Sequence, residues 1–389
     1  MKKRTRMGAV IEEQKTLKHE IGVSNQFHLM DLPIPVLHEI LFRLPINSIM
    51  KVKLVCRALY ELLSDPDFAV NYTKISTFAT LVGTTNFCKD TCAFDNLDLV
   101  EVSDSHECIR TTFKTKIRGV SGFDLVGACN GLLCLSAWKW RTDVVYVCNP
   151  IMGEYMALPE CKIEQNENSE YGFGFCTSTN NYKVLKIVWK PFPVYKEVEI
   201  FTIGIDETWR GLAIRKILFT NFLNNSVALN GAFHWFIMDN GSSRICTFDL
   251  GEEKLGQLSH PPGLLLNLYC MKLMSINNQL SLVDGLGSPV VAIWKMKEYA
   301  VAESWTKDMV LDISFISELQ CRSLEPVTIL QNGDMLFSHL STDYLLLYNP
   351  IKRKVTQIRV GCHGIITCAP SFLSLKEALM GGHQSTMNL

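Results

Sequence analysis

The residues that could do chemistry are scattered along this sequence. It contains 14 cysteines and 9 histidines, and the only suggestive spacings are Cys88 to Cys92 and Cys362-His363 to Cys368. Neither spacing gives the paired short knuckles of a zinc ribbon or finger. Other cysteines, such as Cys134, sit in apolar strings, where a thiol acts as a small hydrophobe. We therefore expect no metal and no other cofactor.

Enzyme motifs are equally scarce. The sequence has no Gly-x-Ser-x-Gly elbow, no His-Glu-x-x-His helix and no phosphate-binding loop, and Gly172-x-Gly174 lacks a third glycine. His234 stands beside Trp235 in a predicted strand, which favours a structural histidine over a general base. Acidic residues fall mainly in turns, and nothing marks a glycosidase-like carboxylate pair. The sequence predicts a protein without a catalytic site of its own.

Composition limits the partners. The 389 residues carry 38 Lys+Arg and 39 Asp+Glu, with 47% apolar residues. This near-neutral balance disfavours a binder of nucleic acid or of anionic membranes. No apolar run approaches the roughly 18 residues of a membrane span, and the first residues show no apolar signal region. We expect a cytoplasmic or nuclear protein, or one found in both, with reduced cysteines.

A helical pattern follows a polar, aperiodic tail over residues 1–26. Leu37, Ile40, Leu41 and Leu44 recur at helical spacing, and a second periodic set ends near Asp65-Pro66. The pattern predicts three short helices within residues 27–75. So small a segment cannot bury its own apolar face. Either the rest of the chain or another protein must cover it.

The order of the motifs in this segment resembles the F-box. The matching residues are Leu32-Pro33, Ile40-Leu41, Leu44-Pro45, Val55-Cys56-Arg57 and Phe68. The resemblance implies binding to the Skp-type adaptor of a ubiquitin ligase, and through it to a cullin and a RING protein. The implied adaptor-contact set comprises Leu32, Pro33, Leu37, Ile40, Leu41, Leu44, Pro45, Val55 and Cys56. Where the family usually has Trp, this chain has Leu59-Tyr60, so a smaller anchor is expected there.

Beyond residue 75 the sequence repeats. Residues 144–150, 244–250 and 344–350 align at an offset of 100 as strand followed by an Asn-Pro or Asp turn. Asn130-Gly131, Asn230-Gly231 and Asn332-Gly333 precede these copies, and residues 181 and 278 open two intermediate units. The unit length is therefore close to 50 residues, with a sixth and weaker unit over about 76–125.

Units of this length with several short strands are typical of a β-propeller. A four-stranded blade cannot bury both of its faces, so blades stack in a ring that closes on itself. The sequence predicts a mainly β protein: an N-terminal helical module followed by about six blades over residues 76–375, and a tail over 376–389. A kelch-like ring would be closed by a terminal segment near 365–375. A pair of stacked β-sandwiches is the alternative.

Four segments in this region resemble the F-box-associated domain of plant F-box proteins, in order and from about 125 to 375. They are Cys129 to Leu135, Tyr171 to Val184, Leu229 to Trp235, and Ile293 to Thr306. Such proteins are substrate receptors of Skp–cullin–F-box ubiquitin ligases, so a target protein is the implied partner. A receptor acts by holding its target near the charged enzyme, which needs no reacting group of its own.

Candidate target contacts lie in loops rich in aromatic residues. Residues 138–141 contribute Trp138, Trp140 and Arg141, and residues 191–195 contribute Phe192 and Tyr195. Packing between blades explains these aromatics equally well. Two rival functions remain open at this point: a scaffold that meets the adaptor without directing ubiquitination, and a propeller enzyme with an accessory helical segment.

Overall fold

The structure is a computed structural model that describes residues 29–379 with gaps. The gaps are 66, 69–70, 73–77, 89–92, 104–106, 115–122, 140–141, 163–167, 192–193, 215–225, 240–241, 265–269, 287, 314–323, 340–343, 362 and 373. The chain divides into two compact units, Met1–Leu44 and Pro45–Leu389.

Short helices begin the described chain. The first unit holds a 3-10 turn, η1 (Leu29–Asp31), and helix α2 (Ile34–Leu41), whose first turn contains Pro35. Proline suits this position because the first helical N–H groups have no partner within the helix. The second unit opens with α3 (Ile46–Lys53) and α4 (Arg57–Leu63), which pack against each other. The three predicted helices are therefore present.

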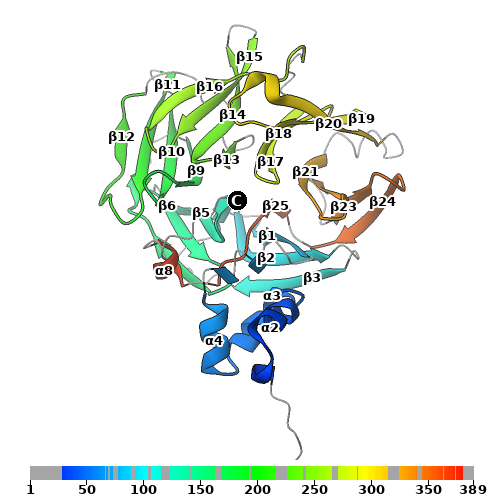
Figure 1. The fold of residues 1–389 in the computed structure, drawn as a ribbon. Coiled ribbons are helices and arrows are strands. Elements are labelled where there is room, and N and C mark those ends of the chain that lie inside the picture. Colours follow the sequence, from blue (N-terminus) through cyan, green and yellow to red (C-terminus); the bar gives the residue numbers. More distant parts are fainter. Residues whose placement is uncertain are drawn as a thin grey trace, which may run out of the picture. The chain divides into compact units, whose positions relative to one another are not determined.

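A six-bladed β-propeller follows (Figure 1). Blades 1 and 2 form one continuous sheet because Phe94 of β2 pairs with Phe123 of β4. In sheet order, blade 1 has β25 (His363–Thr367), β1 (Phe78–Cys88), β2 (Ala93–Ser103) and β3 (Cys108–Lys114). Blade 2 has β4 (Phe123–Cys129), β5 (Leu132–Lys139), β6 (Thr142–Asn149) and β7 (Glu154–Ala157), with β8 (Cys161–Lys162) also on β6.

The remaining four blades are separate four-stranded antiparallel sheets. Blade 3 has β9 (Asn168–Cys176), β10 (Asn181–Pro191), β11 (Val194–Thr202) and β12 (Arg210–Leu212). Blade 4 has β13 (Val227–Leu229), β14 (Ala232–Asp239), β15 (Ser242–Asp249) and β16 (Lys254–Leu258). Blade 5 has β17 (Met271–Ile276), β18 (Gln279–Asp284), β19 (Val290–Met296), η2 (Ala302–Ser304) and β20 (Trp305–Asp312). Blade 6 has β21 (Leu324–Ile329), β22 (Met335–His339), β23 (Tyr344–Asn349) and β24 (Lys354–Arg359).

The blade order explains the sequence repeat. The offset of 100 residues spans two blades, since β6, β15 and β23 are the third strands of blades 2, 4 and 6. The Asn-Gly pairs are the turns between first and second strands, where Asn130 and Asn230 have φ of 48° and 51°. Asparagine tolerates this left-handed conformation better than most residues. Each blade thus begins one strand before the unit that the sequence repeat marks.

The C-terminal part of the chain closes the ring. Strand β25 pairs with β1, so blade 1 takes one strand from the end of the chain and three from its beginning. The prediction of closure by a terminal segment is confirmed. After β25, residues 368–379 contain helix α8 (Leu375–Leu379). We call residues 368–379 the C-terminal strap.

Apolar side chains between adjacent blades hold the ring together. Between blades 3 and 4, Ile187 and Ile200 pack with Trp235 and Phe248 in one buried cluster. Buried apolar clusters also join blades 2 and 3, 4 and 5, 5 and 6, and 6 and 1. Fully burying a side chain of this size contributes about 1.5–3 kcal/mol. The inner strands β18 and β23 each contain four consecutive buried residues. Because successive side chains point to opposite faces of a strand, both faces of these strands are packed inside the ring.

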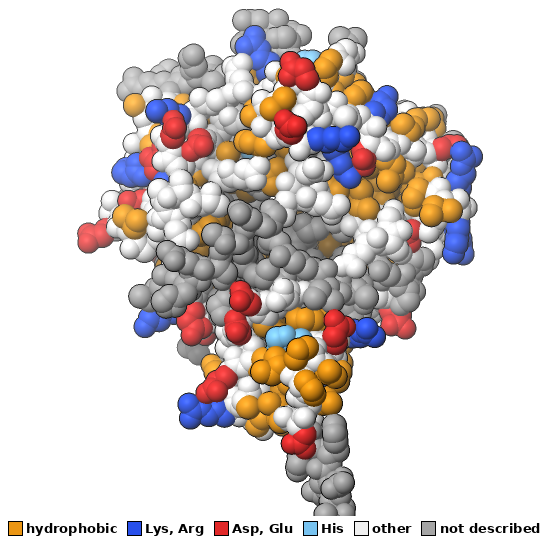
Figure 2. All heavy atoms as spheres, in the orientation of Figure 1, with side chains coloured by type: hydrophobic (Ala, Val, Ile, Leu, Met, Phe, Trp, Pro, Cys, Tyr) orange, Lys and Arg blue, Asp and Glu red, His pale blue; other side chains and the backbone are white. Residues whose placement is uncertain are grey.

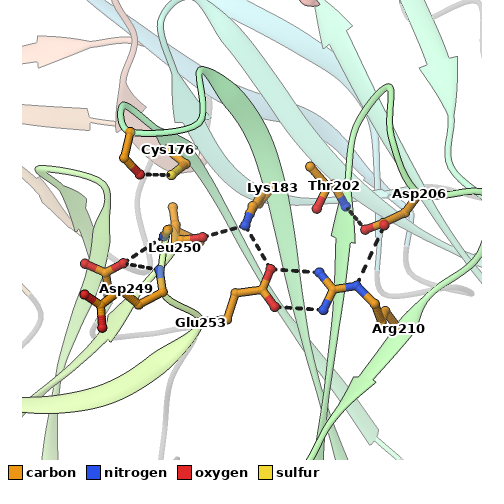
Figure 3. Close-up of polar contacts among 11 residues, drawn as sticks. Cys176, Lys183, Thr202, Asp206, Arg210, Asp249, Leu250 and Glu253 are labelled. Carbon is orange, nitrogen blue, oxygen red and sulfur yellow. Dashed lines mark hydrogen bonds and ion pairs between the residues drawn. The ribbon is translucent and has the colours of Figure 1, made fainter.

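An ion-pair network adds to the contact between blades 3 and 4 (Figure 3). Arg210 of β12 donates two hydrogen bonds of 2.7 Å to Glu253, in the turn after β15. Lys183 of β10 donates to Glu253 at 2.9 Å and to the Leu250 carbonyl oxygen at 2.6 Å. The Arg210 guanidinium is the main cause that lowers the pKa of Glu253 to about 2. Because Glu253 keeps its charge, it joins the two blades over the whole neutral pH range.

Candidate functional site

The described part of the first unit exposes an apolar edge. In the segment from Pro33 to Ile40, Ile34 is 60% exposed and Ile40 is 40% exposed. Leu37 and Leu41, one helical turn apart, are each only 1% exposed. Helix α2 thus has a buried side and a side with large hydrophobic residues open to solvent, which is the pattern expected of an interaction surface.

The second unit exposes apolar residues in the connection between α3 and α4. Leu54 and Val55 lie between the two helices and are 84% and 72% exposed. Cys56, the residue before α4, is exposed as well, and so is Tyr60 within α4. In contrast, Ile49 of α3 and Leu63 of α4 are completely buried. Residues 54–56 with Tyr60, which we call the α3–α4 corner, therefore present an apolar surface that this unit does not use for its own folding.

The structure divides the nine predicted adaptor contacts by burial. Those open to solvent are Pro33, Ile40, Val55 and Cys56; those partly buried are Leu32, Leu44 and Pro45; those buried are Leu37 and Leu41. The contact set remains a prediction, but a charge at Leu41 would disturb folding of the helical segment before it could report on docking. Substitutions at exposed positions are the better probes.

Sequence reasoning missed Leu54 and Tyr60. Leu54 breaks the helical periodicity, which is a signal that the residue follows the end of a helix. Tyr60 stands with Leu59 in place of the family's usual Trp, and the two residues behave differently: Leu59 is 3% exposed, whereas Tyr60 is 51% exposed. The ring of Tyr60 lies 4.9 Å from the Lys53 ammonium.

The described target contacts, Trp138 and Tyr195, lie near one end of the propeller strands. Because neighbouring strands are antiparallel, the hairpins between second and third strands lie at the opposite end from the Asn-Gly turns. The structure places Trp138 in β5 and Tyr195 in β11 rather than in loops. Aromatic residues favour strands. Strand pairing extends to Lys139 with Thr142 in the first hairpin and to Pro191 with Val194 in the second. Trp140, Arg141 and Phe192 lie outside the described residues.

Trp189 is a further aromatic residue near this hairpin end, and its sequence neighbourhood gave no signal of its exposure. It lies in β10, two residues before the hairpin, and its side chain is 37% exposed. Its neighbours Ile187 and Val188 are buried. A tryptophan at the exposed end of a strand is a suitable anchor for a protein partner.

Buried polar groups lie between blades 2 and 3, towards the same hairpin end. The Tyr171 hydroxyl donates a hydrogen bond of 2.9 Å to Asp143. Lys186, paired with Tyr171 across the strands, donates to Glu199 at 3.0 Å. Burial raises the pKa of Asp143, while the Tyr171 hydrogen bond and the Lys186 charge oppose that rise. The bond between Tyr171 and Asp143 therefore joins the two blades, while Lys186 and Glu199 pair within blade 3.

His234 is a structural residue, as expected. Its ring is fully buried, with Nδ1 3.2 Å from the Val227 carbonyl oxygen and Nε2 2.7 Å from the Tyr299 hydroxyl. A carbonyl oxygen can only accept, so Nδ1 carries the proton and Nε2 accepts from Tyr299. Burial lowers the pKa of His234 to about 4. The imidazole is therefore neutral at physiological pH and joins blade 4 to the turn after β19.

The described residues form neither a metal site nor, on the face drawn in Figure 2, an extended patch of one charge. Within the described residues no three His, Cys, Asp or Glu side chains come together as a metal site; Cys92 and Cys362 lie outside them. No helix in the described part of the chain is long and apolar enough to cross a bilayer. On the face drawn in Figure 2, basic and acidic side chains lie next to each other over the described surface of the propeller. The mixture of charges gives this face no extended positive potential that would attract a polyanion.

The helical segment with its exposed corner and the six-bladed ring define a protein made of a short helical module and a β-propeller. Comparison with known families agrees. Residues 29–71 match the F-box domain, and residues 87–371 match the F-box associated beta propeller domain. The chain therefore belongs to the family of F-box proteins with an F-box-associated β-propeller.

Plant proteins are among its relatives. The chain is 28% identical to the F-box protein At3g07870 of Arabidopsis thaliana, over 85% of this chain and 87% of that protein. It is 24% identical to the F-box/kelch-repeat protein At3g23880 of the same plant, over 71% and 78%. Among solved structures, TolB from Acinetobacter baumannii is similar at 13% identity and a TM-score of 0.44, over 79% of this chain and 70% of TolB. So distant a likeness has no bearing on function.

Proposed function

We propose that this protein is the target-recognition subunit of a Skp–cullin–F-box ubiquitin ligase. In this proposal the helical segment binds a Skp-type adaptor, which connects it to a cullin and a RING protein. The propeller binds a target protein at the hairpin end of its strands. The protein then promotes ubiquitination by raising the effective concentration of target lysines near the charged enzyme, without a catalytic side chain.

The observation that carries this proposal is the α3–α4 corner. Leu54 and Val55, both more than 70% exposed, lie inside the F-box match and next to the buried core of their own unit. Exposed leucine and valine side chains on a folded module cost solubility unless a partner covers them. A helical adaptor with an apolar groove would bury these residues as anchors.

Val55→Asp tests adaptor binding directly. Because Val55 is 72% exposed, the substitution should leave the fold intact while placing a charge in the proposed interface. We expect adaptor affinity to fall by about 30-fold or more, since a central apolar anchor contributes about 2 kcal/mol or more. Calorimetry with a purified Skp-type adaptor measures the change.

Ile351→Asp is the matched control. Ile351 is 88% exposed in the turn after β23, far along the chain from the F-box match. Its substitution should leave adaptor affinity unchanged. Equal binding by the Val55→Asp protein and the wild type would remove the proposal that this corner is the docking surface.

The target side is tested by partner capture. Mass spectrometry of proteins retained by the wild type, by Val55→Asp and by Trp189→Ala should give two separable sets. Val55→Asp should lose the adaptor and the ligase subunits, and Trp189→Ala should lose only the proteins held by the propeller. A reconstituted ligase that leaves the captured target unmodified would favour the scaffold function instead.

A further inference from the structure

Helix α3 is held at its N-terminal end by the propeller. The N–H of Ile46, the first residue of α3, donates to both carboxylate oxygens of Glu101, at 2.9 Å and 3.1 Å. Glu101 belongs to β2 of blade 1 and is completely buried. The residue before the helix, Pro45, supplies no side-chain cap. A carboxylate that is distant in sequence thus does the work that a local capping residue usually does, and it complements the positive end of the helix dipole.

Burying the Glu101 carboxylate costs free energy, because the charged group loses its hydration. Burial raises the pKa of Glu101 to about 7, against the opposing hydrogen bonds from the Ile46 N–H and the Tyr72 hydroxyl. The Tyr72 hydroxyl lies 3.3 Å from Glu101. An apolar residue at position 101 would avoid this desolvation cost. Glu101 therefore supplies something that burial alone does not, namely a directed bond to one helix end.

The C-terminal end of α3 is held by the strap. Lys53, the last residue of α3, is 4% exposed, and its ammonium donates to the Phe372 carbonyl oxygen at 2.7 Å. Burial lowers the pKa of Lys53, and the charges of Glu377 and Glu154 oppose that shift. A cation in the last turn also complements the helix dipole. The second end of α3 is thus joined to the segment that follows the closing strand.

The strap is itself fixed to blade 2. The Asn149 side chain donates to the Ser371 carbonyl oxygen at 3.1 Å, and the Leu375 N–H donates to Glu154 of β7. The Phe372 ring packs edge-on against Phe68 and Tyr72, with centroids 5.7 Å and 5.6 Å away. All three rings are almost completely buried. The strap therefore connects the region after α4 to the ring through both polar and aromatic contacts.

We propose that Glu101 and Lys53 are positioning residues that fasten helix α3 to the propeller at both of its ends, so that α3, α4 and the ring move as one body. Two attachments about 12 Å apart, the length of an eight-residue helix, remove rotation that a single contact would allow. The C-terminal strap then has two roles: it follows the strand that closes the ring, and it anchors the adaptor-bearing helices.

The consequence for the ligase rests on the proposed function. A receptor that holds its adaptor-bearing helices at a fixed angle keeps the target at a fixed distance from the charged enzyme. Effective concentration falls when the connection is loose, because the target then samples a larger volume. Buried hydrogen bonds suit this purpose, because a hydrogen bond has a preferred direction, whereas hydrophobic burial is non-directional.

The test measures the motion of α4 relative to the ring in the full chain without adaptor. Spin labels on non-natural amino acids at Glu61, 61% exposed on α4, and at Lys254, 74% exposed on β16, report the distance distribution. The wild type should give one narrow distribution. The double variant Glu101→Leu with Lys53→Met removes both acceptor and donor side chains. It should give a broad distribution, and hydrogen exchange at the Ile46 amide should rise about tenfold or more.

Lys51→Met is the matched control, because Lys51 is exposed on the same helix. It should change neither the distance distribution nor the exchange rate. A broad distribution in the wild type would overturn the proposal, whether or not the double variant folds. So would a narrow distribution in a folded double variant.

Adaptor affinity is measured in parallel to keep the two proposals apart. Because Lys53 contacts the Tyr60 ring of the α3–α4 corner, this comparison uses the single variant Glu101→Leu. It should bind a Skp-type adaptor within about threefold of the wild type, since Glu101 lies in β2 and outside the corner. Failure of the wild type to bind the adaptor would count against the proposed function, whereas the distance measurement alone decides the fastening of α3.

Discussion

His234 shows how one buried side chain makes the stability of the propeller depend on pH. Its pKa falls from the ordinary 6.5 to about 4 because the ring is desolvated. The unfolded chain therefore takes up a proton on this residue at higher pH than the folded chain does. The stabilisation is complete above about pH 6.5 and is lost as the pH falls towards about 4.

We expect the wild type to lose about 3 kcal/mol of unfolding free energy between about pH 7 and about pH 4, relative to the His234→Gln variant. The glutamine cannot titrate, so the difference between the two proteins isolates the histidine from the other acidic and basic groups. Urea unfolding at several pH values measures it. A difference that does not vary with pH would show that folding leaves the pKa of His234 unchanged.

For individual residues, the sequence predicted whether a side chain is structural more reliably than it predicted how exposed that side chain is. The buried, satisfied state of His234 was predictable because it sits in a strand of alternating apolar residues beside Trp235. In the helical segment, periodicity grouped Leu41 with Ile40, yet the structure buries the former at 1% and exposes the latter at 40%. Both positions belong to one broad apolar stripe, and only the packing around it decides which edge stays open.

At the scale of elements, the first turn of blade 2 is a tight junction. Gly131 has φ of 79°, and a Cβ there would lie 2.6 Å from the backbone nitrogen of Ser371 in the strap. Gly204, in the turn after β11, has φ of 82° but no atom within 4 Å of such a Cβ. The two glycines therefore share the backbone requirement, and only Gly131 also has a neighbour that excludes a side chain.

Gly204→Ala should cost about 1–2 kcal/mol, which is the strain of an alanine at positive φ. Gly131→Ala should cost at least about 3 kcal/mol, because the strap must move away as well. Thermal unfolding of both variants gives the comparison. Equal costs would mean that the strap does not press against this turn.

The turns were the most predictable elements of the fold. Asn-Gly pairs and the Asn or Asp residues at 149, 249 and 349 fix local backbone conformations, and their side chains accept N–H groups two or three residues on. Such local chemistry is visible in any sequence. The contacts of Glu101 with Ile46 and of Lys53 with Phe372 join residues 55 and 319 positions apart, and no local pattern marks them.

At the scale of the whole molecule, closure of the ring and anchoring of α3 depend on successive stretches of the same C-terminal chain. Strand β25 pairs Thr367 with Leu81 and Ile366 with Val82 of β1. Phe372, five residues beyond β25, contacts Lys53 and the Phe68 and Tyr72 rings. Two truncations can therefore separate the two roles.

A chain that ends at residue 370 keeps β25 and loses the strap beyond it. We expect a closed, monomeric ring that is less stable by about 3–5 kcal/mol, the typical cost of removing a buried phenylalanine, with rapid exchange at the Ile46 amide. A chain that ends at residue 361 also loses β25. Blade 1 then exposes the edge of β1, and an unpaired edge next to buried Leu81 and Val82 invites pairing with another chain.

Light scattering after size exclusion distinguishes these outcomes. The longer truncated chain should elute as a monomer and the shorter one as dimers or aggregates, because only the shorter one lacks the strand that satisfies β1. If the shorter chain were monomeric and unfolded with the same midpoint as the longer one, closure by β25 would contribute nothing to the ring. If the longer chain kept full protection at Ile46, Glu101 alone would hold α3, and the strap would serve blade 2 only.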